Sequence, residues 1–297
     1  MHLQSLDDVL VLLEEGNLSR AAARRNITQP AFSRRIRGFE DWLGVEVLDR
    51  HTNRVDISQA LISNEGEIRA LIARLRELRT KIGRYDATRT TLAIAAQHAA
   101  TCSTFPDMAL RARAALPGVQ FRLRAGNLND CVTMFLRGDT SMLLCYEAES
   151  VGPLQFGPDI LRGVWGNDYL IPVVGGALRY RVRDKGRVDA DTPTIVYPED
   201  SYFGKVLHNS RRPFGVPGSD GSSCTVTAFS SGVRELILAG LGIGWLPFSM
   251  VHQEVQSGAL ISLANAYGKE PLQVAVYADA RMPTAQSLME LWTKQLS

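Results

Sequence analysis

The chain of 297 residues is longer than the usual single domain of about 100 to 150 residues, so we expect two or three folded units. Hydrophobic residues make up 45% and charged residues 22% of the sequence, which excludes a mainly disordered chain. No stretch approaches the roughly 18 uncharged apolar residues of a membrane helix. The first residues carry acids where a signal peptide would carry bases. We therefore expect a cytoplasmic protein without a membrane partner.

The net charge of +2 is unevenly distributed along the chain. Residues 1–85 contain 14 Lys or Arg and 12 Asp or Glu, whereas residues 86–297 contain 19 of each. One run in the first part has no acid and six arginines, namely Arg20, Arg24, Arg25, Arg34, Arg35 and Arg37. Such a block is typical of a phosphate-binding module, and charge alone does not distinguish it from a solvated helix face.

The first 43 residues predict three helices. Apolar residues at helical spacing over 6–13 indicate the first, and a second short helix spans about 18–25 before a tight turn. Thr28 is the expected N-cap of the third helix, which has Pro30 in its first turn and runs to about residue 43. Its inner face carries Phe32, Ile36, Phe39 and Leu43, and its outer face carries Gln29, Ser33, Arg34 and Arg37.

Two helices joined by a tight turn, the second with a Gln/Ser/Arg outer face, predict a helix-turn-helix. Arginine can bond guanine O6 and N7 with two hydrogen bonds, and glutamine can do the same with adenine. Residues 44–57 follow as two short strands around a basic tip, which predicts a wing whose Arg50 and Arg54 reach phosphates or the minor groove.

These residues resemble the winged helix-turn-helix of LysR-type transcriptional regulators over about residues 3–65. The resemblance is carried by Leu18-Ser19-Arg20-Ala21-Ala22, Ile27-Thr28-Gln29-Pro30-Ala31-Phe32-Ser33-Arg34-Arg35-Ile36-Arg37, Glu40 and Leu43-Gly44-Val45. It implies a recognition helix over about 29–43 that binds double-stranded DNA. It also implies DNA contacts at Thr28, Gln29, Pro30, Ser33, Arg34, Arg37, Arg50 and Arg54.

Residues 58–85 predict one long helix with a narrow apolar seam. Its two sets at seven-residue spacing are Leu61, Ile68, Leu75 and Ile82, and Leu71, Leu78 and Tyr85. The simplest partner for such a seam is a second copy of the helix, as the resemblance also implies, and a symmetric dimer reads two half-sites related by a dyad. The alternative is that the seam packs on the protein's own second domain.

Beyond residue 88, short strands alternate with helices, which predicts a mostly parallel α/β sheet. Strands are expected over 91–96, 119–124 and 142–146, and helices over 103–115 and 129–137. The alternating pattern resumes through 170–174, 194–197, 202–209, 224–228, 231–239 and 243–246, and a closing helix is expected over about 283–296. Two small α/β lobes fit this order, with hinges near 162–167 and 265–272. The segment resembles the effector domain of the same family, which is similar to periplasmic binding proteins, through 118–123, 136–139 and 241–247.

In open α/β sheets, ligands bind outside the carboxyl ends of the strands, in the crevice between lobes. The side chains at those ends are Gln97, His98, Thr101, Asn127, Asn129, Cys145, Tyr146, Glu147, Tyr202, Thr225 and Thr227. As a set they predict a pocket for a small effector, which an anionic group would suit, although each alone also fits a capping or core role. Trp245 and Phe248 either line this crevice or fill the core of the second lobe.

Within the family, the second half most resembles a branch that contains a hypochlorite-responsive regulator, through 95–98, 201–204 and 242–247. Sensing there is attributed to methionines, but Phe203 and Phe229 stand in the corresponding stretches. Four methionines lie on apolar stripes and are expected to be core residues, namely Met108, Met134, Met142 and Met289. The cysteines Cys102, Cys131, Cys145 and Cys224 form no CxxC pair and are expected to be reduced.

We therefore expect three parts. They are a winged helix-turn-helix (1–57), a linker and dimerisation helix (58–88) and a two-lobed effector domain (89–297), with lobe I over 89–164 and 268–297 and lobe II over 165–267. The predicted function is a ligand-responsive DNA-binding regulator that forms homodimers or homotetramers and can contact RNA polymerase. The alternatives are a regulator that senses Cys or Met oxidation and a solute-binding protein that does not bind DNA. A hydrolase would need a nucleophile with a paired base, and neither that pair nor a metal or cofactor motif is present.

Overall fold

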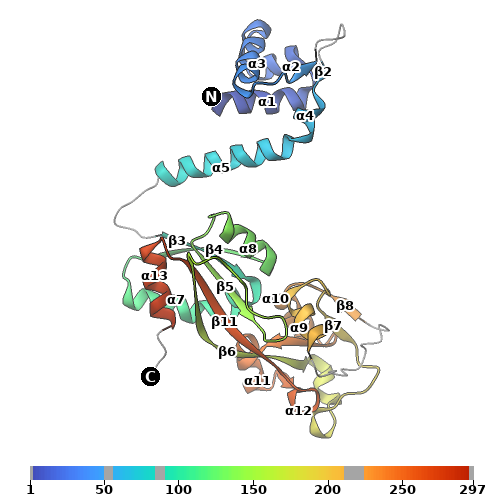
Figure 1. Ribbon diagram of the computed structural model, residues 1–297. Helices are drawn as coiled ribbons and strands as arrows, with labels where there is room; N and C mark the ends of the chain where they lie inside the picture. The colour runs from blue at the N-terminus through green and yellow to red at the C-terminus, as the bar shows by residue number, and fades with distance from the viewer. Residues whose placement is uncertain (1–2, 50–55, 84–90, 211–223, 294–297) are drawn as a thin grey trace. The chain divides into compact units, whose positions relative to one another are not determined.

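The computed structural model describes residues 3–49, 56–83, 91–210 and 224–293. The predicted DNA contacts Arg50 and Arg54 and the seam residue Tyr85 lie outside these ranges. The chain divides after Asp86 into two compact units, an N-terminal and a C-terminal unit, each with its own core (Figure 1). No helix in the described ranges is both long and apolar enough to cross a bilayer.

The N-terminal unit is a winged helix-turn-helix followed by a two-part helical linker. Its elements are α1 (Leu3–Glu15), α2 (Leu18–Arg24), α3 (Gln29–Leu43), β1 (Leu48–Asp49), β2 (Asp56–Ile57), α4 (Gln59–Ser63) and α5 (Glu65–Gly83). Strands β1 and β2 pair antiparallel as the base of the wing.

Local signals set the ends of the helices. Gly16 ends α1 with φ +61°, and the Asn17 side chain caps α2 by accepting hydrogen bonds from Ser19 N and Arg20 N at 2.8 and 3.2 Å. Thr28 is the N-cap of α3 in its backbone, but its hydroxyl makes no capping hydrogen bond. The first N–H groups of α3 therefore have no side-chain cap.

The predicted inner face of α3 forms much of the N-terminal core. Phe32, Ile36 and Phe39 are buried and pack against apolar residues of α1, α2 and the wing. Leu43 is an exception, with 43% of its surface exposed at the end of the helix. The carboxylate of Glu40 lies in this core and accepts hydrogen bonds from Val47 N at 2.9 Å and Leu48 N at 3.1 Å. It thereby joins the recognition helix to the wing.

The linker differs from the predicted single helix. It breaks at Asn64 between α4 and α5. Three residues of the predicted seam pack on their own unit, with Leu61 buried and Ile68 and Leu75 partly buried, and Ile72, which is outside the predicted seam, is buried in the same core. The ion pairs Arg69–Glu14 and Arg76–Asp7 also hold α5 to α1, at 2.8 and 2.6 Å. The exposed apolar side chains of α5 are Leu71 (47%), Leu78 (49%) and Ile82 (68%).

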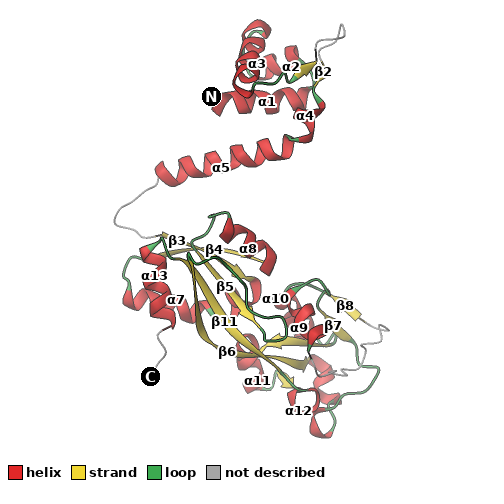
Figure 2. Cartoon of the chain, in the orientation of Figure 1, coloured by secondary structure: helices red, strands yellow, loops and turns green. Residues whose placement is uncertain are grey.

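The C-terminal unit contains a nine-stranded mixed sheet with helices on its faces (Figure 2). Its strands are β3 (Thr91–Gln97), β4 (Gln120–Gly126), β5 (Met142–Glu147), β6 (Ile160–Gly175), β7 (Thr194–Val196), β8 (Cys224–Val226), β9 (Ile243–Pro247), β10 (Leu260–Ser262) and β11 (Glu270–Asp279). Its helices are α6 (His98–Ser103), α7 (Phe105–Ala115), α8 (Leu128–Leu136), α9 (Tyr202–Asn209), α10 (Ser230–Leu238), α11 (Phe248–Ser257), α12 (Ala264–Tyr267) and α13 (Pro283–Thr293), with 3₁₀ turns η1 (Gly176–Arg181) and η2 (Asp184–Gly186).

Two long strands connect the lobes where the sequence predicted hinges. The order of the sheet is β4-β3-β5-β11-β6-β9-β7-β8, and β6 pairs antiparallel with β11 along the whole of β11 (Figure 1). We call the part built on β3, β4 and β5 the first lobe and the part built on β7, β8, β9 and β10 the second lobe. The expected hinge at 162–167 lies inside β6, and the expected hinge at 265–272 includes the start of β11.

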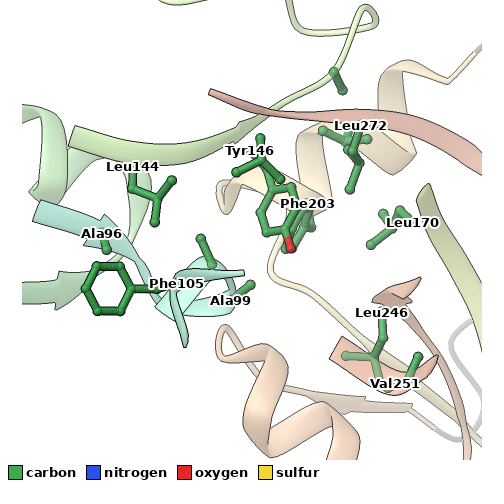
Figure 3. Packing of buried hydrophobic residues seen from close by; sticks show 14 of the residues in the cluster. Ala96, Ala99, Phe105, Leu144, Tyr146, Leu170, Phe203, Leu246, Val251 and Leu272 are labelled. Carbon is green, nitrogen blue, oxygen red and sulfur yellow. The ribbon is translucent and has the colours of Figure 1, made fainter. Parts of the chain in front are cut away.

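One core runs through both lobes (Figure 3). Tyr146 and Phe203 lie between Ala96 and Leu144 of the first lobe and Leu170 and Leu246 on the other side. Their ring centroids are 5.6 Å apart. Tyr146 and Phe203 therefore belong to a continuous, mostly aliphatic core that joins the two lobes.

Candidate functional site

The outer face of α3 is accessible along its length. Thr28, Gln29, Pro30, Arg34 and Arg37 are exposed, and Ser33 is half-buried. The uncapped first turn of this helix adds N–H groups that can donate to a phosphate oxygen. The structure thus gathers the six predicted DNA-contact residues that it describes on one surface.

The arginine block that carries the charge of this unit is mostly neutralised within the fold. Four of its six arginines form ion pairs with acids of α1: Arg20 with Glu15, Arg24 with Glu14 and Glu15, and Arg25 and Arg35 with Asp8. Within the described ranges, Arg34 and Arg37 form none. The two cations that remain available are therefore both on the outer face of the recognition helix.

In the C-terminal unit, four chain segments meet at a small cavity between the lobes. It is lined by Gln97, His98 and Ala99, by Gly126, Asn127 and Leu128, by Tyr197, Ser201, Tyr202 and Phe203, and by Ala228 and Ser230. These residues follow the carboxyl ends of β3, β4, β7 and β8 and begin α6, α8, α9 and α10. The lining contains no carboxylate, lysine or arginine, so the N–H dipoles of the helix ends are its main electrostatic feature.

Two residues of this lining carry a buried polar atom without a hydrogen bond of good geometry, namely His98 Nδ1 and Tyr202 Oη. The Tyr202 hydroxyl lies near the Ala148 backbone, outside the lining, whereas Tyr197 Oη lies 2.8 Å from Ser230 Oγ. Burial raises the pKa of the Tyr202 hydroxyl, so it stays protonated as a donor. The cavity holds only about 20 Å³, which is room for one water molecule. A larger ligand requires the lobes to separate.

Only some of the residues predicted for the effector pocket line this cavity, namely Gln97, His98, Asn127 and Tyr202. The Gln97 amide oxygen already accepts a hydrogen bond from Tyr146 N at 2.9 Å. Thr101 lies one turn along α6 with its hydroxyl 3.3 Å from Gln97 O. Asn129 is exposed on α8, Thr225 is exposed on the edge strand β8, and Thr227 is half-buried beyond that strand. None of these three is in the lining.

The prediction for Cys145 and Tyr146 was wrong. The Cys145 side chain is buried in a separate core beneath α8, together with Cys131. The Tyr146 hydroxyl is buried in a polar network, 2.7 Å from Ser103 Oγ, 3.0 Å from Ser249 Oγ and 3.2 Å from Asp168 Oδ2. Successive residues of a strand point to opposite faces of the sheet, and both faces of β5 are covered.

The sequence of the C-terminal unit matches the LysR substrate-binding domain over residues 86–297, and residues 3–60 match the bacterial regulatory helix-turn-helix of the lysR family. The chain belongs to the LysR family of transcription regulators. It is therefore a DNA-binding regulator with an effector-binding domain, and members of this family are regulators and not enzymes. LysR regulators bind DNA and small-molecule effectors.

Individual relatives agree with this assignment. The regulator YjiE of Escherichia coli K12 is 26% identical over 92% of this chain and 87% of its own length. The full-length structure of HypT from Salmonella typhimurium superposes with a TM-score of 0.63 at 25% identity, covering 99% of this chain and all of HypT. Vibrio fischeri DarR in complex with DNA gives a TM-score of 0.70 at 21% identity and 99% coverage of both chains, which shows the shared fold.

Sequence reasoning missed several residues of this LysR-type regulator that shape its two sites. Tyr197, Ser201 and Ser230 line the cavity, and the position of Ser201 before α9 was a usable signal because its hydroxyl accepts from Gly204 N. The pairing of Asp8 with two arginines depends on the packing of α1 against α2 and α3, which no local pattern reveals.

Proposed function

We propose that this regulator reads its operator through Thr28, Gln29, Pro30, Ser33, Arg34 and Arg37, with Arg50 and Arg54 of the wing adding contacts to the backbone. The observation that carries this proposal is the selective pairing of the arginine block, which leaves Arg34 and Arg37 free beside Gln29 and Ser33. Arginine and glutamine on one helix face suit guanine and adenine edges in the major groove.

The proposal includes a homodimer formed through the exposed stripe Leu71, Leu78 and Ile82 of α5. These side chains lie at spacings of seven and four residues, as in a helix-helix seam, and no described part of the chain covers them. A dimer with twofold symmetry reads a dyad-symmetric operator. Association of effector domains into a homotetramer and contact with RNA polymerase follow from the family resemblance.

The signal, in our proposal, is a small molecule with an anionic group that enters the cavity at His98 and Tyr202. Three helices of eight or more residues begin at this cavity, and their N–H groups favour a negative charge. The named signals of similar proteins differ: one neighbour is described as hypochlorite-specific and another as having arginine bound. The lining of this cavity, and not the signals of similar proteins, therefore indicates the chemistry of the effector.

The size of the cavity indicates how the regulator responds when its effector binds. Since it has room for only one water molecule, a larger effector binds only to an arrangement in which the lobes have moved along β6 and β11. A ligand that binds one arrangement better than the other shifts the population toward it. That shift would change how two effector domains meet and how the recognition helices are spaced.

The DNA part is tested by selecting operators from a random-sequence duplex library with the full-length chain, followed by footprinting. We expect two related half-sites about one helical turn apart or a multiple of that spacing. Selection of a single unrepeated site would contradict the symmetric dimer. Failure to enrich any sequence at low salt would contradict the recognition surface.

The effector part is tested by thermal unfolding of the full chain with a panel of acetate, sulfate, phosphate, bromide and short dicarboxylates, against choline and urea as cationic and neutral probes. A ligand at about 100 times its Kd stabilises the native state by about 2.7 kcal/mol. We expect stabilisation by at least one anion, reduced in Tyr202→Phe and retained in Thr225→Val outside the cavity. Stabilisation only by the cationic or neutral probes would refute the anionic class.

A further inference from the structure

Asp8 is a fully buried carboxylate at the centre of the helix-turn-helix. It lies on the inner face of α1, where Leu6, Val9 and Leu12 are also buried, and none of its surface is exposed. Arg25 Nε donates to Asp8 Oδ1 at 2.5 Å, and Arg35 Nη1 lies 3.4 Å from Asp8 Oδ2. The other acids that neutralise the arginine block, Glu14 and Glu15, are partly exposed to solvent.

Stability alone does not explain a charge at this position. Burying an ion pair removes both partners from water, and apolar side chains of similar volume often serve equally well. The other buried residues of α1, namely Leu6, Val9 and Leu12, are apolar, so an apolar residue here would extend an existing core. The feature that an apolar residue could not supply is a countercharge for two arginines.

The two arginines flank the DNA-binding surface. Arg25 is the C-cap of α2, directly before the turn, and Arg35 lies on α3 between the free arginines Arg34 and Arg37. The Arg25 and Arg35 side chains keep 28% and 44% of their surface exposed, so both are close to solvent. Without Asp8, each protomer would present up to two more unpaired cations at this surface.

Unpaired cations raise affinity for every DNA sequence alike. Phosphate contacts carry no sequence information directly, and each one steepens the salt dependence of binding. We propose that Asp8 is a specificity-determining residue: it holds Arg25 and Arg35 in ion pairs within the fold and so limits phosphate attraction to the arginines that read the operator. Asp8 touches no DNA itself and acts by positioning these two side chains.

The test compares Asp8→Asn with Glu67→Gln in the full-length chain, because both substitutions remove one negative charge and Glu67 is exposed on α5. Binding to a mixed-sequence duplex of 40 base pairs is measured by fluorescence anisotropy across a salt series. For Asp8→Asn we expect tighter non-specific binding and a slope of log K against log salt that steepens by about 0.9 for each new phosphate contact. The preference for a selected operator over this duplex should fall.

A purely structural role for Asp8 predicts the opposite, namely weaker binding to both duplexes without a steeper slope. The triple variant Asp8→Asn/Arg25→Gln/Arg35→Gln should return the slope to that of the unsubstituted chain. The proposal is overturned if Asp8→Asn matches Glu67→Gln in slope, or if the triple variant keeps the steeper slope.

A second variant keeps the test decisive if Asp8→Asn does not fold. Arg35→Gln preserves the Asp8–Arg25 pair, and Arg35 is held by Asp8 in the native fold. Its non-specific affinity and slope should therefore equal those of the unsubstituted chain. A loss of affinity with a shallower slope would show that Arg35 already contacts phosphate and would overturn the proposal.

Discussion

The two candidate sites, the DNA-binding surface of the N-terminal unit and the cavity of the C-terminal unit, differ in whether their buried polar groups have partners. In the N-terminal unit, the buried carboxylates Asp8 and Glu40 are both satisfied, by two arginines and by two backbone N–H groups. In the C-terminal unit, His98 Nδ1 and Tyr202 Oη remain without partners at the cavity between the lobes. Buried polar groups with partners hold the DNA-binding surface in one conformation. Buried polar groups without hydrogen-bond partners mark where a ligand would complete the effector domain.

Electrostatics shows the same contrast. The N-terminal surface is cationic because specific arginines are left unpaired, while the effector cavity has no charged side chain and only helix-end dipoles. A preformed cationic surface suits a large polyanion that approaches from solvent. A small neutral cavity suits a ligand whose charge is met by N–H groups once water is displaced.

The largest expected effect concerns the exposed apolar stripe of α5, formed by Leu71, Leu78 and Ile82. Leu71→Asp with Leu78→Asp should convert the dimer to monomers, because burying a leucine contributes about 1.5–3 kcal/mol and a dimer contains four of these side chains. Sedimentation equilibrium measures the change. As a control, Ile68→Asp should destabilise the N-terminal unit itself, since Ile68 packs in its core. A double variant that stays dimeric would refute the seam.

Next in size is the anchor between the recognition helix and the wing. Glu40→Ala leaves the buried Val47 and Leu48 N–H groups without an acceptor, at about 1–3 kcal/mol each. Thermal or urea unfolding should therefore show a loss of about 2–4 kcal/mol. Glu46→Ala is the surface control, because Glu46 is exposed, and it should change stability by less than about 0.5 kcal/mol. Equal losses in both variants would contradict the role of Glu40.

Some parts of the two sites could be predicted from the sequence. The recognition helix follows from local signals, because Thr28, Pro30 and the spacing of Phe32, Ile36 and Phe39 all act within one helix. The segment 202–209 was delimited in the alternating pattern with the bounds of α9, and the strand-end rule selected His98 and Tyr202, which both line the cavity. Local periodicity and cap residues sufficed wherever a single element decides the outcome.

The features that the sequence did not predict depend on contacts between residues far apart in the chain. Hinges were predicted near 162–167 and 265–272, but the long strands β6 and β11 at these positions were not; Gly163 and Gly166 in the first half of β6 suggest a break. Gly163 is instead needed because Thr293 of α13 lies so close that a Cβ would clash. The linker seam was read as one stripe because heptad spacing does not tell which apolar side chains meet α1 and which stay free.

The third prediction tests whether oxidation of a cysteine thiol, in place of ligand binding, is the signal for the effector domain. Burial raises the pKa of the Cys131 thiol to about 11 from an ordinary value of 9.0, so its thiolate population at pH 8 is roughly a hundredfold smaller than for an ordinary thiol. Burial raises the pKa of Cys145 as well, whereas Cys102 is exposed.

Alkylation by iodoacetamide, followed by peptide mass spectrometry, should therefore label Cys102 first. Labelling of Cys131 should increase about tenfold per pH unit above pH 8, as deprotonation rises toward the elevated pKa, provided that the fold stays intact. Thermal unfolding at each pH is the control. Rapid labelling of Cys131 or Cys145 at pH 7 in the folded chain would revive the redox alternative.

A fourth, smaller effect tests the division of the arginine block into paired and free members. Arg34→Ala and Arg37→Ala should each weaken binding to a selected operator by about 1–3 kcal/mol, because each removes a base or phosphate contact. Arg24→Ala is the matched control, since Arg24 pairs with Glu14 and Glu15. We expect Arg24→Ala to lose much less operator-binding free energy than Arg34→Ala or Arg37→Ala. Equal losses in all three variants would show that internal pairing does not select the reading residues.

The smallest expected effect bears most directly on the difference between the units. Tyr202→Phe removes a buried hydroxyl that has no partner, so the free energy of unfolding should change by less than about 0.5 kcal/mol or rise slightly. Tyr197→Phe removes a hydroxyl that is hydrogen-bonded to Ser230 in the same cavity wall, and it should cost about 1 kcal/mol. Urea unfolding of the two variants side by side measures the difference. If Tyr202→Phe were the more destabilising of the two, the Tyr202 hydroxyl would already have a hydrogen-bond partner in the free protein. The buried polar groups at the cavity would then not differ from those of the N-terminal unit, and the comparison between the units would fail.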